Sequence, residues 1–544
     1  MSRTALAHVV PIICRTAIYY LFLSGCTVRC ISCSSKLVLQ KIEDEDLRSM
    51  KFLSHSSAPK VKQICQRTMV ESHIDFLNSI TTDIVKNEDQ KDLCNLYSLL
   101  KPIPKGLALL TREFENHIKS IGLQCMKNMT DSNLPQYFVE STLDIFHRFS
   151  EFVRSLFRND AEFWNALDRA CLSIINYREQ GSGIPKAAEW LAKHVDQLLR
   201  KTTKGLSESE IEDKLAYAIV VFRYIEDKDV FQKFYSRMLA QRLIHSLSVS
   251  MYAEESMIGK LKHVCGYEFT SKFQRMFTDV GVSKELTGRF LNMLEDKNET
   301  LDVGFQVLVL QVGFVFALCG RPCLAFMFSL FTGRCLAAVR THESRLSIRE
   351  YGKLVWLHLT GRKITWLYNL STADLKLNYL PRSYTVTVTL YQLSVLLHFN
   401  DGDTATMEDF KTITQVTDES LERHLRCLVD TKLLLCDVRT MQVKSVRCFS
   451  ISVCRLAVRL TATECEHVGN TVQQDRKYFL ECAVVRIMKS SKLLKHNQLV
   501  QEVIQQARPR FVPEVHLIKK VIEQLIEKQY LKRTENSDEY AYLA

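Results

Sequence analysis

The last seventy residues of this 544-residue chain carry the pattern that most constrains its fold. Apolar side chains recur there at helical spacing, which predicts an amphipathic helix with one buried face. The buried positions are Leu480, Ala483, Val484, Ile487 and Met488. The basic side chains Arg486, Lys489 and Lys492 fall outside this face and should be exposed to solvent. Lys489 is therefore predicted to be an exposed, reachable amine.

Two further helices and a hairpin are predicted after this helix. Asn497 would cap a second helix, which Pro509 should end. A third helix should begin near Pro513, because proline is favoured in a first helical turn. Its expected buried positions are Val515, Ile518, Val521, Ile522, Leu525 and Ile526. Short strands at Tyr530–Leu531 and Tyr540–Leu543 would then form a hairpin, and this order of elements is typical of a winged helix.

The predicted winged-helix domain, residues 471–544, has a basic surface that leaves two functions open. Residues 482–533 contain eleven Lys or Arg against four Glu. Many winged helices bind DNA, so nucleic-acid binding is an alternative function for this chain. The same charge excess also fits a solvated helical face that contacts protein partners, and the charges alone do not separate the two.

The composition favours a mainly helical protein. Hydrophobic residues make up 46% of the chain, which has only 18 glycines and 10 prolines, so a turn-rich β protein is disfavoured. The length suffices for about three or four domains. The 72 Lys and Arg exceed the 61 Asp and Glu, and the net charge of +11 suggests acidic partners without naming one.

The 18 cysteines are scattered rather than arranged in a spaced framework. Cys125, Cys171, Cys265 and Cys482 each stand alone within a helical pattern. Reduced, buried thiols are the simplest interpretation. The chain is therefore expected in the cytoplasm and nucleus.

Residues 1–44 form an atypical segment of unknown structure. The apolar run Ala17–Leu23 resembles a short signal segment, but nothing after it is typical of a secreted protein. Cys26, Cys30 and Cys33 have the Cys-x3-Cys-x2-Cys spacing with which radical enzymes hold an iron–sulfur cluster. Those enzymes need repeated strand–helix units, whereas helices follow here. We therefore expect no metal, no cofactor and no catalytic residue.

Two helical regions follow the atypical segment. Residues 45–200 show apolar stripes on successive helices, which indicate a stacked helical stalk of the kind that serves as an interaction scaffold. Residues 201–300 form a further helical bundle. At its centre Glu226 and Asp229 alternate with basic and aromatic residues, and acid–base catalysis is conceivable there. Neighbouring opposite charges on one helix more often form a salt-bridged surface, which is the interpretation we adopt.

Mixed α/β structure is expected in residues 301–470. Apolar residues alternate at 303–309 and again at 384–390, as in half-buried strands. Between them, residues 314–336 are strongly apolar, but arginine and proline interrupt the run and no membrane span is expected. Residues 406–437 repeat a helix–turn–helix and strand layout, which indicates a first winged-helix element.

Several segments resemble the cullin family. They include Ile225-Glu226-Asp227-Lys228-Asp229-Val230-Phe231 and the terminal Val485-Arg486-Ile487-Met488-Lys489. The others are 238–245, 265–272, 361–367 and 540–544. The resemblance covers most of residues 45–544. Details at Ile175–Glu179 and Asn378–Leu380 are most similar to the cullin branch that uses elongin adaptors.

The resemblance implies a mainly α scaffold with a helical stalk, a four-helix bundle, an α/β sheet region and a C-terminal winged helix. Such a scaffold serves a multi-subunit ubiquitin ligase. It holds a RING-box protein, which recruits the ubiquitin-conjugating enzyme, and it performs no bond chemistry itself. In this family the lysine of the Val-Arg-Ile-Met-Lys motif accepts a ubiquitin-like modifier through an isopeptide bond.

The corresponding residues here are Lys489 as the acceptor, with Val485, Arg486, Ile487 and Met488 as its motif. Arg486 and the basic face around it would help to steer the acidic conjugation machinery toward the lysine. On this interpretation neither nucleic acid nor a membrane is an expected partner.

The chain also departs from the family pattern in three places. Only about one and a half of the three expected stalk repeats are recognised, and the helices that would bind an elongin-type adaptor are not among them. An atypical apolar insert near 314–344 replaces a polar passage where the strand of the RING-box protein would enter. Residues 438–466 are shorter and richer in cysteine than expected, which leaves the last strands of that sheet undefined.

Overall fold

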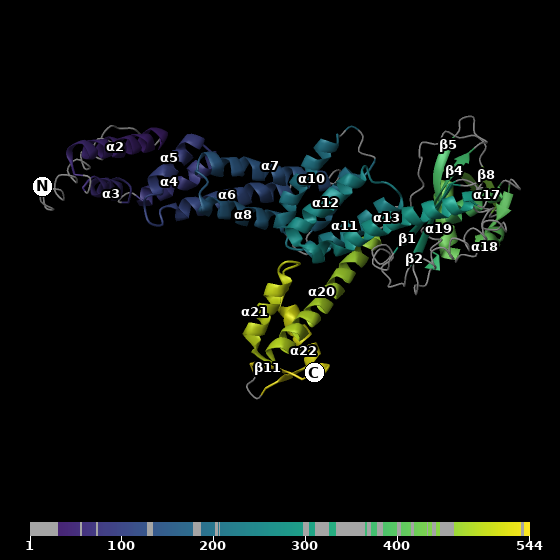
Figure 1. Ribbon diagram of the computed structural model, residues 1–544. Helices are drawn as coiled ribbons and strands as arrows, with labels where there is room; N and C mark the ends of the chain where they lie inside the picture. The colour runs from purple at the N-terminus through teal and green to yellow at the C-terminus, as the bar shows by residue number, and fades with distance from the viewer. Residues whose placement is uncertain are drawn as a thin grey trace. The chain divides into compact units, whose positions relative to one another are not determined.

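A computed structural model gives the fold of the chain (Figure 1). The residues that it describes are 31–54, 57–71, 74–127, 134–177, 186–201, 205, 207–296, 304–310, 326–332, 365–366, 372–377, 384–399, 404–414, 418–431, 433–437, 442–445, 462–534 and 538–543. The predictions for Cys26, Cys30 and the run Ala17–Leu23 concern residues outside these ranges. The described chain is mainly helical, as the composition predicts.

The chain divides into two compact units. Unit 1 contains residues 1–194, 216–228 and 510–512. Unit 2 contains residues 195–215, 229–509 and 513–544. None of the helices in the described part is long and apolar enough to cross a membrane.

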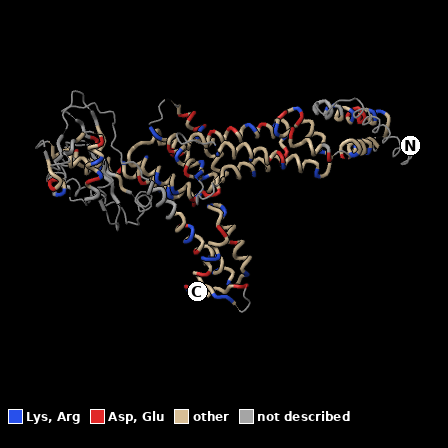
Figure 2. Tube along the Cα trace, turned by 180° about the vertical axis from the view of Figure 1, so that it is seen from behind, with Lys and Arg blue, Asp and Glu red and all other residues tan. Residues whose placement is uncertain are grey.

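Unit 1 is a stack of helices, which confirms the predicted stalk. Helices α6, α7 and α8 run side by side along it (Figure 1). Acidic and basic residues are interspersed along its helices (Figure 2). Its helices are α2 Ile31–Phe52, α3 Ala58–Met69, α4 Ile74–Asn87, α5 Gln90–Leu100, α6 Leu107–Lys127, α7 Leu134–Ser155 and α8 Ala161–Ile175. Helices α9 Ala187–Leu199 and α10 Glu208–Tyr224 each contribute residues to both units.

The core of the stalk is built from aromatic rings contributed by four helices and a connecting loop. Phe114, Phe149 and Phe163 are almost fully buried, together with Phe157 and Tyr97. The rings of Phe157 and Phe163 stack with centroids 3.9 Å apart, and Phe114 packs edge-on against Phe157 at 5.3 Å. Aromatic pairs of this geometry stabilise a core beyond the area that they bury.

The expected boundary between residues 44 and 45 is wrong. Helix α2 runs without a break from Ile31 to Phe52, so residue 44 lies inside a continuous element. Its apolar positions include Ile42, which is buried in the core that the later stalk helices share. The atypical composition of residues 1–44 therefore does not mark a structural boundary at this point.

Unit 2 begins with a helical bundle around a buried arginine. Its further helices are α11 Lys228–Ile244, α12 Met251–Cys265 and α13 Tyr267–Asp296. The Arg242 side chain is fully buried, and its Nε and Nη2 donate to the two oxygens of Glu254 at 2.6 and 2.9 Å. Its Nη1 donates to Asp196 Oδ1 at 2.6 Å. The charge is thus paired on all sides, as a buried ion must be.

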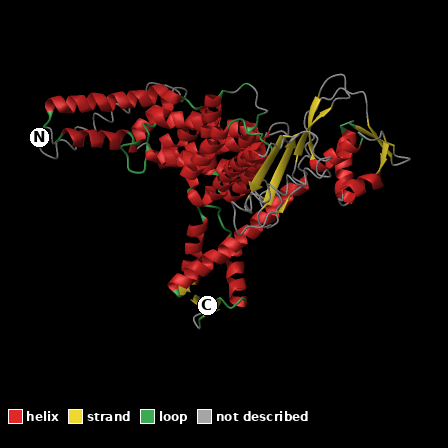
Figure 3. Ribbon diagram, turned by 45° about the vertical axis from the view of Figure 1, so that its right-hand side comes forward, coloured by secondary structure: helices red, strands yellow, loops and turns green. Residues whose placement is uncertain are grey.

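The α/β region contains a five-stranded sheet (Figure 3). Its strands are β1 Gly304–Leu310, β2 Phe326–Thr332, β3 Thr365–Trp366, β4 Thr372–Leu377 and β5 Tyr384–Thr389. The order is β1-β2-β4-β5, with β3 also paired to β2. Strand β2 comes from the apolar insert near 314–344. Part of that insert is therefore an internal strand of the sheet, which the sequence did not predict.

A first winged-helix element follows the sheet and confirms the expected layout. It consists of α17 Leu390–His398, β6 Thr404–Thr406, α18 Met407–Thr414, α19 Asp418–Asp430, β7 Leu434–Asp437 and β8 Gln442–Ser445. The strand predicted through Leu390 ends at Thr389. There a capping box forms, because the Thr389 side chain accepts from the Gln392 amide and the Gln392 side chain accepts in return from Thr389. Local capping therefore ends the strand and starts α17.

The C-terminal winged helix is also present, but it begins inside a long helix. Its elements are α20 Ala462–Ser491, β9 Leu493–Lys495, α21 His496–Ala507, α22 Val515–Glu527, β10 Leu531–Arg533 and β11 Glu539–Tyr542. The expected boundary between residues 470 and 471 is wrong, because α20 passes through it unbroken. The three short strands pair in the order β10-β11-β9.

Candidate functional site

Lys489 lies in the last turn of α20, and its side chain is exposed. The predicted opposite face, formed by the five apolar residues from Leu480 to Met488, is buried throughout. Arg486 and Lys492 are exposed, as predicted. An enzyme can therefore approach the Lys489 amine from solvent, while the helix that carries it is anchored by its apolar face.

The end of α20 is fixed by contacts with the C-terminal strand. Lys492 has φ +62°, and its amide donates to the Met488 carbonyl at 2.8 Å, which closes the helix. The Tyr542 amide donates to the Lys492 carbonyl at 2.9 Å. The Lys492 ammonium also lies over the Tyr542 ring, 5.1 Å from its centroid. The residues after Lys489 are thus held against the end of the chain.

The wing has three strands, whereas the sequence predicted a hairpin of two. Strand β9 pairs antiparallel with β11, with Leu494 opposite Tyr540. Only three residues long, β9 is too short to give an alternating pattern that could be recognised. Its presence places a strand between Lys489 and the second helix.

This strand also moves the start of the second helix. Asn497 was the predicted cap, but α21 begins at His496, and Lys495 at the cap position makes no side-chain capping bond. The His496 amide instead donates to the Asp538 carbonyl at 2.7 Å. Pairing with β11 therefore replaces side-chain capping at this turn.

His496 and Tyr540 link the second helix to the wing. The Nδ1 atom of His496 lies 3.0 Å from the Tyr540 hydroxyl oxygen. Burial raises the pKa of Tyr540, so its hydroxyl stays protonated and can take part in this hydrogen bond. The contact joins the first residue of α21 to β11.

The third helix buries the predicted residues Ile518, Val521, Ile522 and Leu525. The prediction for Val515 is wrong, because this first residue of α22 is 47% exposed. A residue in the first turn of a helix can match the helical period and still lie beyond the neighbouring elements that would bury it. The face that carries Lys489 is unaffected by this difference.

The expectation of buried thiols holds only in part. Cys171 is buried, and burial raises its pKa to about 12, which keeps the thiol protonated. Cys125 and Cys265 are half-buried. Cys482 is exposed on α20, which contradicts the expectation, because it lies next to the apolar face without belonging to it.

The charged residues considered for catalysis have another role. Asp229 forms an ion pair with a residue of another helix. It accepts from Arg476 of α20, and Lys233 pairs with Asp475 of the same helix. Glu226 is bound to Asn176, whose side chain accepts from its amide at 3.0 Å. The Asp229 carboxylate thus makes a contact between helices, whereas Glu226 contributes its backbone amide.

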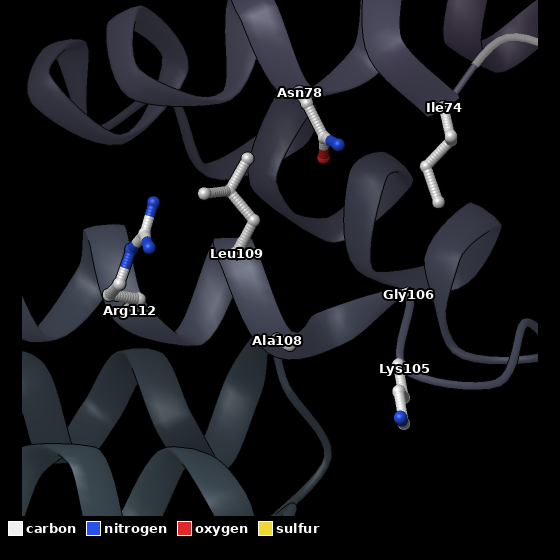
Figure 4. A pocket seen from close by; sticks show the side chains of 7 residues that line it. All are labelled: Ile74, Asn78, Lys105, Gly106, Ala108, Leu109 and Arg112. Carbon is white, nitrogen blue, oxygen red and sulfur yellow. The ribbon is translucent and has the colours of Figure 1, made fainter.

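The stalk contains Cys33 of the predicted cysteine cluster and a surface hollow. Cys33 lies in α2, and within the described chain no group of His, Cys, Asp or Glu could hold a metal ion. A hollow of about 280 Å³ opens beside the start of α6 (Figure 4). Its lining residues are Ile74, Asn78, Lys105, Gly106, Ala108, Leu109 and Arg112. This lining has no carboxylate, hydroxyl, thiol or imidazole side chain.

Comparison with known proteins places the chain in a family. Residues 12–287 match the cullin alpha solenoid domain, 343–453 match the cullin alpha+beta domain, and 475–537 match the cullin protein neddylation domain. The chain belongs to the cullin family. It is therefore similar in kind to the scaffold subunits of cullin-RING ubiquitin ligases, and its neddylation domain contains Lys489.

Individual cullins match over nearly the whole chain. Cullin-2 of Caenorhabditis elegans is 43% identical, and the alignment covers 98% of this chain and 69% of that protein. Cullin-1 of Dictyostelium discoideum is 36% identical, with 94% and 67% covered. The higher identity to a Cullin-2 fits the elongin-adaptor branch that the sequence details indicated.

A solved structure was also matched, titled "A Dual E3 Mechanism for Rub1 Ligation to Cdc53: Dcn1(P)-Cdc53(WHB)". It is 41% identical over 16% of this cullin and 100% of that chain, with a TM-score of 0.15.

The family matches refine two expectations. The solenoid match starts at residue 12, so most of the segment 1–44 belongs to the region that resembles the family. Almost all of the insert near 314–344, including β2, lies between the matches that end at 287 and begin at 343. The atypical character of the insert is therefore visible in both the sequence and the family comparison.

Proposed function

We propose that this cullin holds a RING-box protein and, through it, a ubiquitin-conjugating enzyme, and that attachment of a ubiquitin-like modifier to Lys489 activates the assembly. The cullin itself contributes position and no bond chemistry. The proposal includes action in the cytoplasm and nucleus, which rests on the cysteine pattern of the sequence.

The exposed Lys489 at the end of α20 is the observation that carries this proposal. It lies within the neddylation-domain match and at the last position of the motif that begins with Val485. An isopeptide bond requires a primary amine that the conjugating enzyme can reach. Lys489 meets this requirement, and the wing contacts of Lys492 and Tyr542 hold the adjoining chain in place.

The basic surface of the winged helix supports the same function rather than DNA binding. Arg486, Lys519 and Lys520 are exposed around the domain, and Lys528 forms an ion pair with Glu481 at 3.2 Å. Exposed positive charge accelerates encounters with acidic proteins as well as with nucleic acid. The neddylation-domain match over residues 475–537 favours the protein partner.

Replacing Lys489 with arginine tests the proposed acceptor. The change keeps the positive charge but removes the amine, because a guanidinium stays protonated and cannot act as the nucleophile. Incubation with the modifier and its conjugating enzymes should therefore give no adduct above background. The adduct of the unaltered protein should map to Lys489 by peptide mass spectrometry.

Lys492→Arg is the matched control. Lys492 is also exposed and follows Lys489 by three residues, so this variant should be modified at the rate of the unaltered protein. Modification of Lys489→Arg to the same extent as the unaltered protein would refute the assignment of the acceptor.

A further inference from the structure

Two ion pairs join α20 to the first helix of the bundle in unit 2. The Nε and Nη2 atoms of Arg476 donate to the two carboxylate oxygens of Asp229 at 2.5 and 2.7 Å. The Lys233 ammonium lies 2.5 Å from Asp475 Oδ2. These four residues form the α11–α20 ion-pair cluster. Each helix contributes one acid and one base, so the cluster is self-neutralising.

The Arg476–Asp229 pair has the geometry and burial of an orienting contact. Its side chains are only 12% and 19% exposed. A bidentate arginine–carboxylate pair fixes direction as well as distance, because both parallel hydrogen bonds must be satisfied together. The Lys233–Asp475 pair is more open, with Asp475 47% exposed, and solvent screens it more strongly.

Contacts within α11 also hold the Asp229 side chain in place. It lies in the first turn of α11, where the helix dipole favours a negative charge. Its Oδ1 atom also accepts from the Val230 amide at 2.9 Å. The carboxylate therefore has a fixed orientation, and an arginine that binds it adopts that orientation too.

The cluster lies on the same unbroken helix as the acceptor lysine. Thirteen residues separate Arg476 from Lys489, which corresponds to about 20 Å along an α-helix. A small change of direction at the cluster is therefore amplified at Lys489.

We propose that Asp229, Lys233, Asp475 and Arg476 are positioning residues for modifier attachment. They fix the direction of α20 on the bundle and thereby hold Lys489 at a defined place. This inference rests on the proposed function for its effect on modification. The contact between the two helices can be measured independently of that function.

Charge reversal and charge exchange test the cluster. Arg476→Asp places two carboxylates opposite each other, and Asp229→Arg places two cations opposite each other. The double variant Asp229→Arg with Arg476→Asp restores an opposite pair in reversed order. Lys477→Asp is the matched control, because it makes the same charge change on the next residue, for which no ion pair is described.

The first measurement is zero-length carbodiimide cross-linking, which joins an amine to a carboxylate that it contacts. In the unaltered protein a cross-linked peptide between Lys233 and Asp475 is expected by mass spectrometry. Its yield should fall severalfold in each single variant and recover in the double variant. It should stay unchanged in Lys477→Asp. Circular dichroism checks that each variant keeps its helical content.

The second measurement is the initial rate of modifier attachment to Lys489. Each single variant should lower it by roughly threefold to tenfold, which lies within the range of measured pair coupling energies, and the double variant should restore it. Absence of the Lys233–Asp475 cross-link in the unaltered protein would overturn the proposal. An unchanged rate in folded single variants would do the same.

The outcome also separates this inference from the proposed function. If neither the unaltered protein nor any variant is modified at Lys489, the assignment of Lys489 as the acceptor is refuted. The cross-linking yields still decide whether the cluster fixes α20. If modification occurs at Lys489 in every variant at one rate, the acceptor stands and the positioning role is refuted.

Discussion

Gly122 sets the distance between two helices of the stalk. It is buried in α6 and faces Ile174 of α8. A Cβ atom at this position would lie 2.5 Å from Cγ1 and 2.9 Å from Cγ2 of Ile174, closer than atoms can pack. Ile174 is itself buried and branched at Cβ, so it has little freedom to move away.

Gly122→Ala should therefore destabilise the protein despite the helix propensity of alanine. Overpacking of a core costs about 1–3 kcal/mol, and the propensity gain returns about 1 kcal/mol at most. We expect a net loss of up to about 2 kcal/mol, measured as a lower midpoint in thermal or urea unfolding.

Gly259→Ala provides the comparison, because nothing lies within 4 Å of its added Cβ on α12. This variant should be as stable as the unaltered protein or slightly more so. Equal stability of the two variants would show that α6 and α8 adjust to the added methyl group without strain.

Strand β2 shows what a single element contributes to the α/β region. It pairs with β1 over seven residues, with Ser329 opposite Val307, and with β4 over three. The only strand that pairs with β1 in the described sheet is β2. The apolar insert therefore supplies β2, the strand that connects β1 to the rest of the described sheet.

Ser329→Pro should disrupt this neighbour. Proline has no amide hydrogen and cannot take part in an internal ladder. We expect faster hydrogen exchange of the amides of β1, Gly304–Leu310, measured by mass spectrometry, with unchanged exchange in α21 and α22. Ser329→Thr keeps the amide and should behave like the unaltered protein. Unchanged exchange of β1 in the proline variant would contradict the pairing.

At the scale of the whole molecule, the stalk, bundle, α/β region and winged helix follow one another in cullin order. A scaffold acts by presenting separate surfaces to separate partners, so its function requires each region to fold. The described cores of the two units meet this requirement. Strands β1 and β2 of the α/β sheet lie between the solenoid match, which ends at residue 287, and the alpha+beta match, which begins at residue 343.

Co-expression of the full chain with a RING-box protein tests the proposed assembly. We expect a stable complex that survives affinity purification and gel filtration, because stable protein interfaces bury more than about 1,000 Å². An unrelated tagged protein serves as the control for adventitious capture. If the RING-box protein is lost from the folded chain, this part of the proposed function fails, while the assignment of Lys489 is unaffected.

Local patterns allowed much of the fold and site to be predicted. The helical period identified the buried face of α20 and thereby the exposure of Lys489, since a residue's side of a helix depends only on its spacing from its neighbours. Turn residues and short apolar runs identified both winged-helix elements. The motif at residues 485–489 indicated the family.

The tertiary structure decided the contacts between segments distant in the sequence. Asp229 has a charged neighbour one residue before it and another four residues after it, and nothing local indicates that its partner is Arg476. Strand β9 forms because it can pair with the edge of β11. Gly122 sets the spacing of α6 and α8 because Ile174 lies opposite it. The sequence by itself determined which faces are apolar and that Lys489 is exposed. Only the packing of whole elements determined which charges meet and where α20 is held, because such pairings depend on the path of the entire chain.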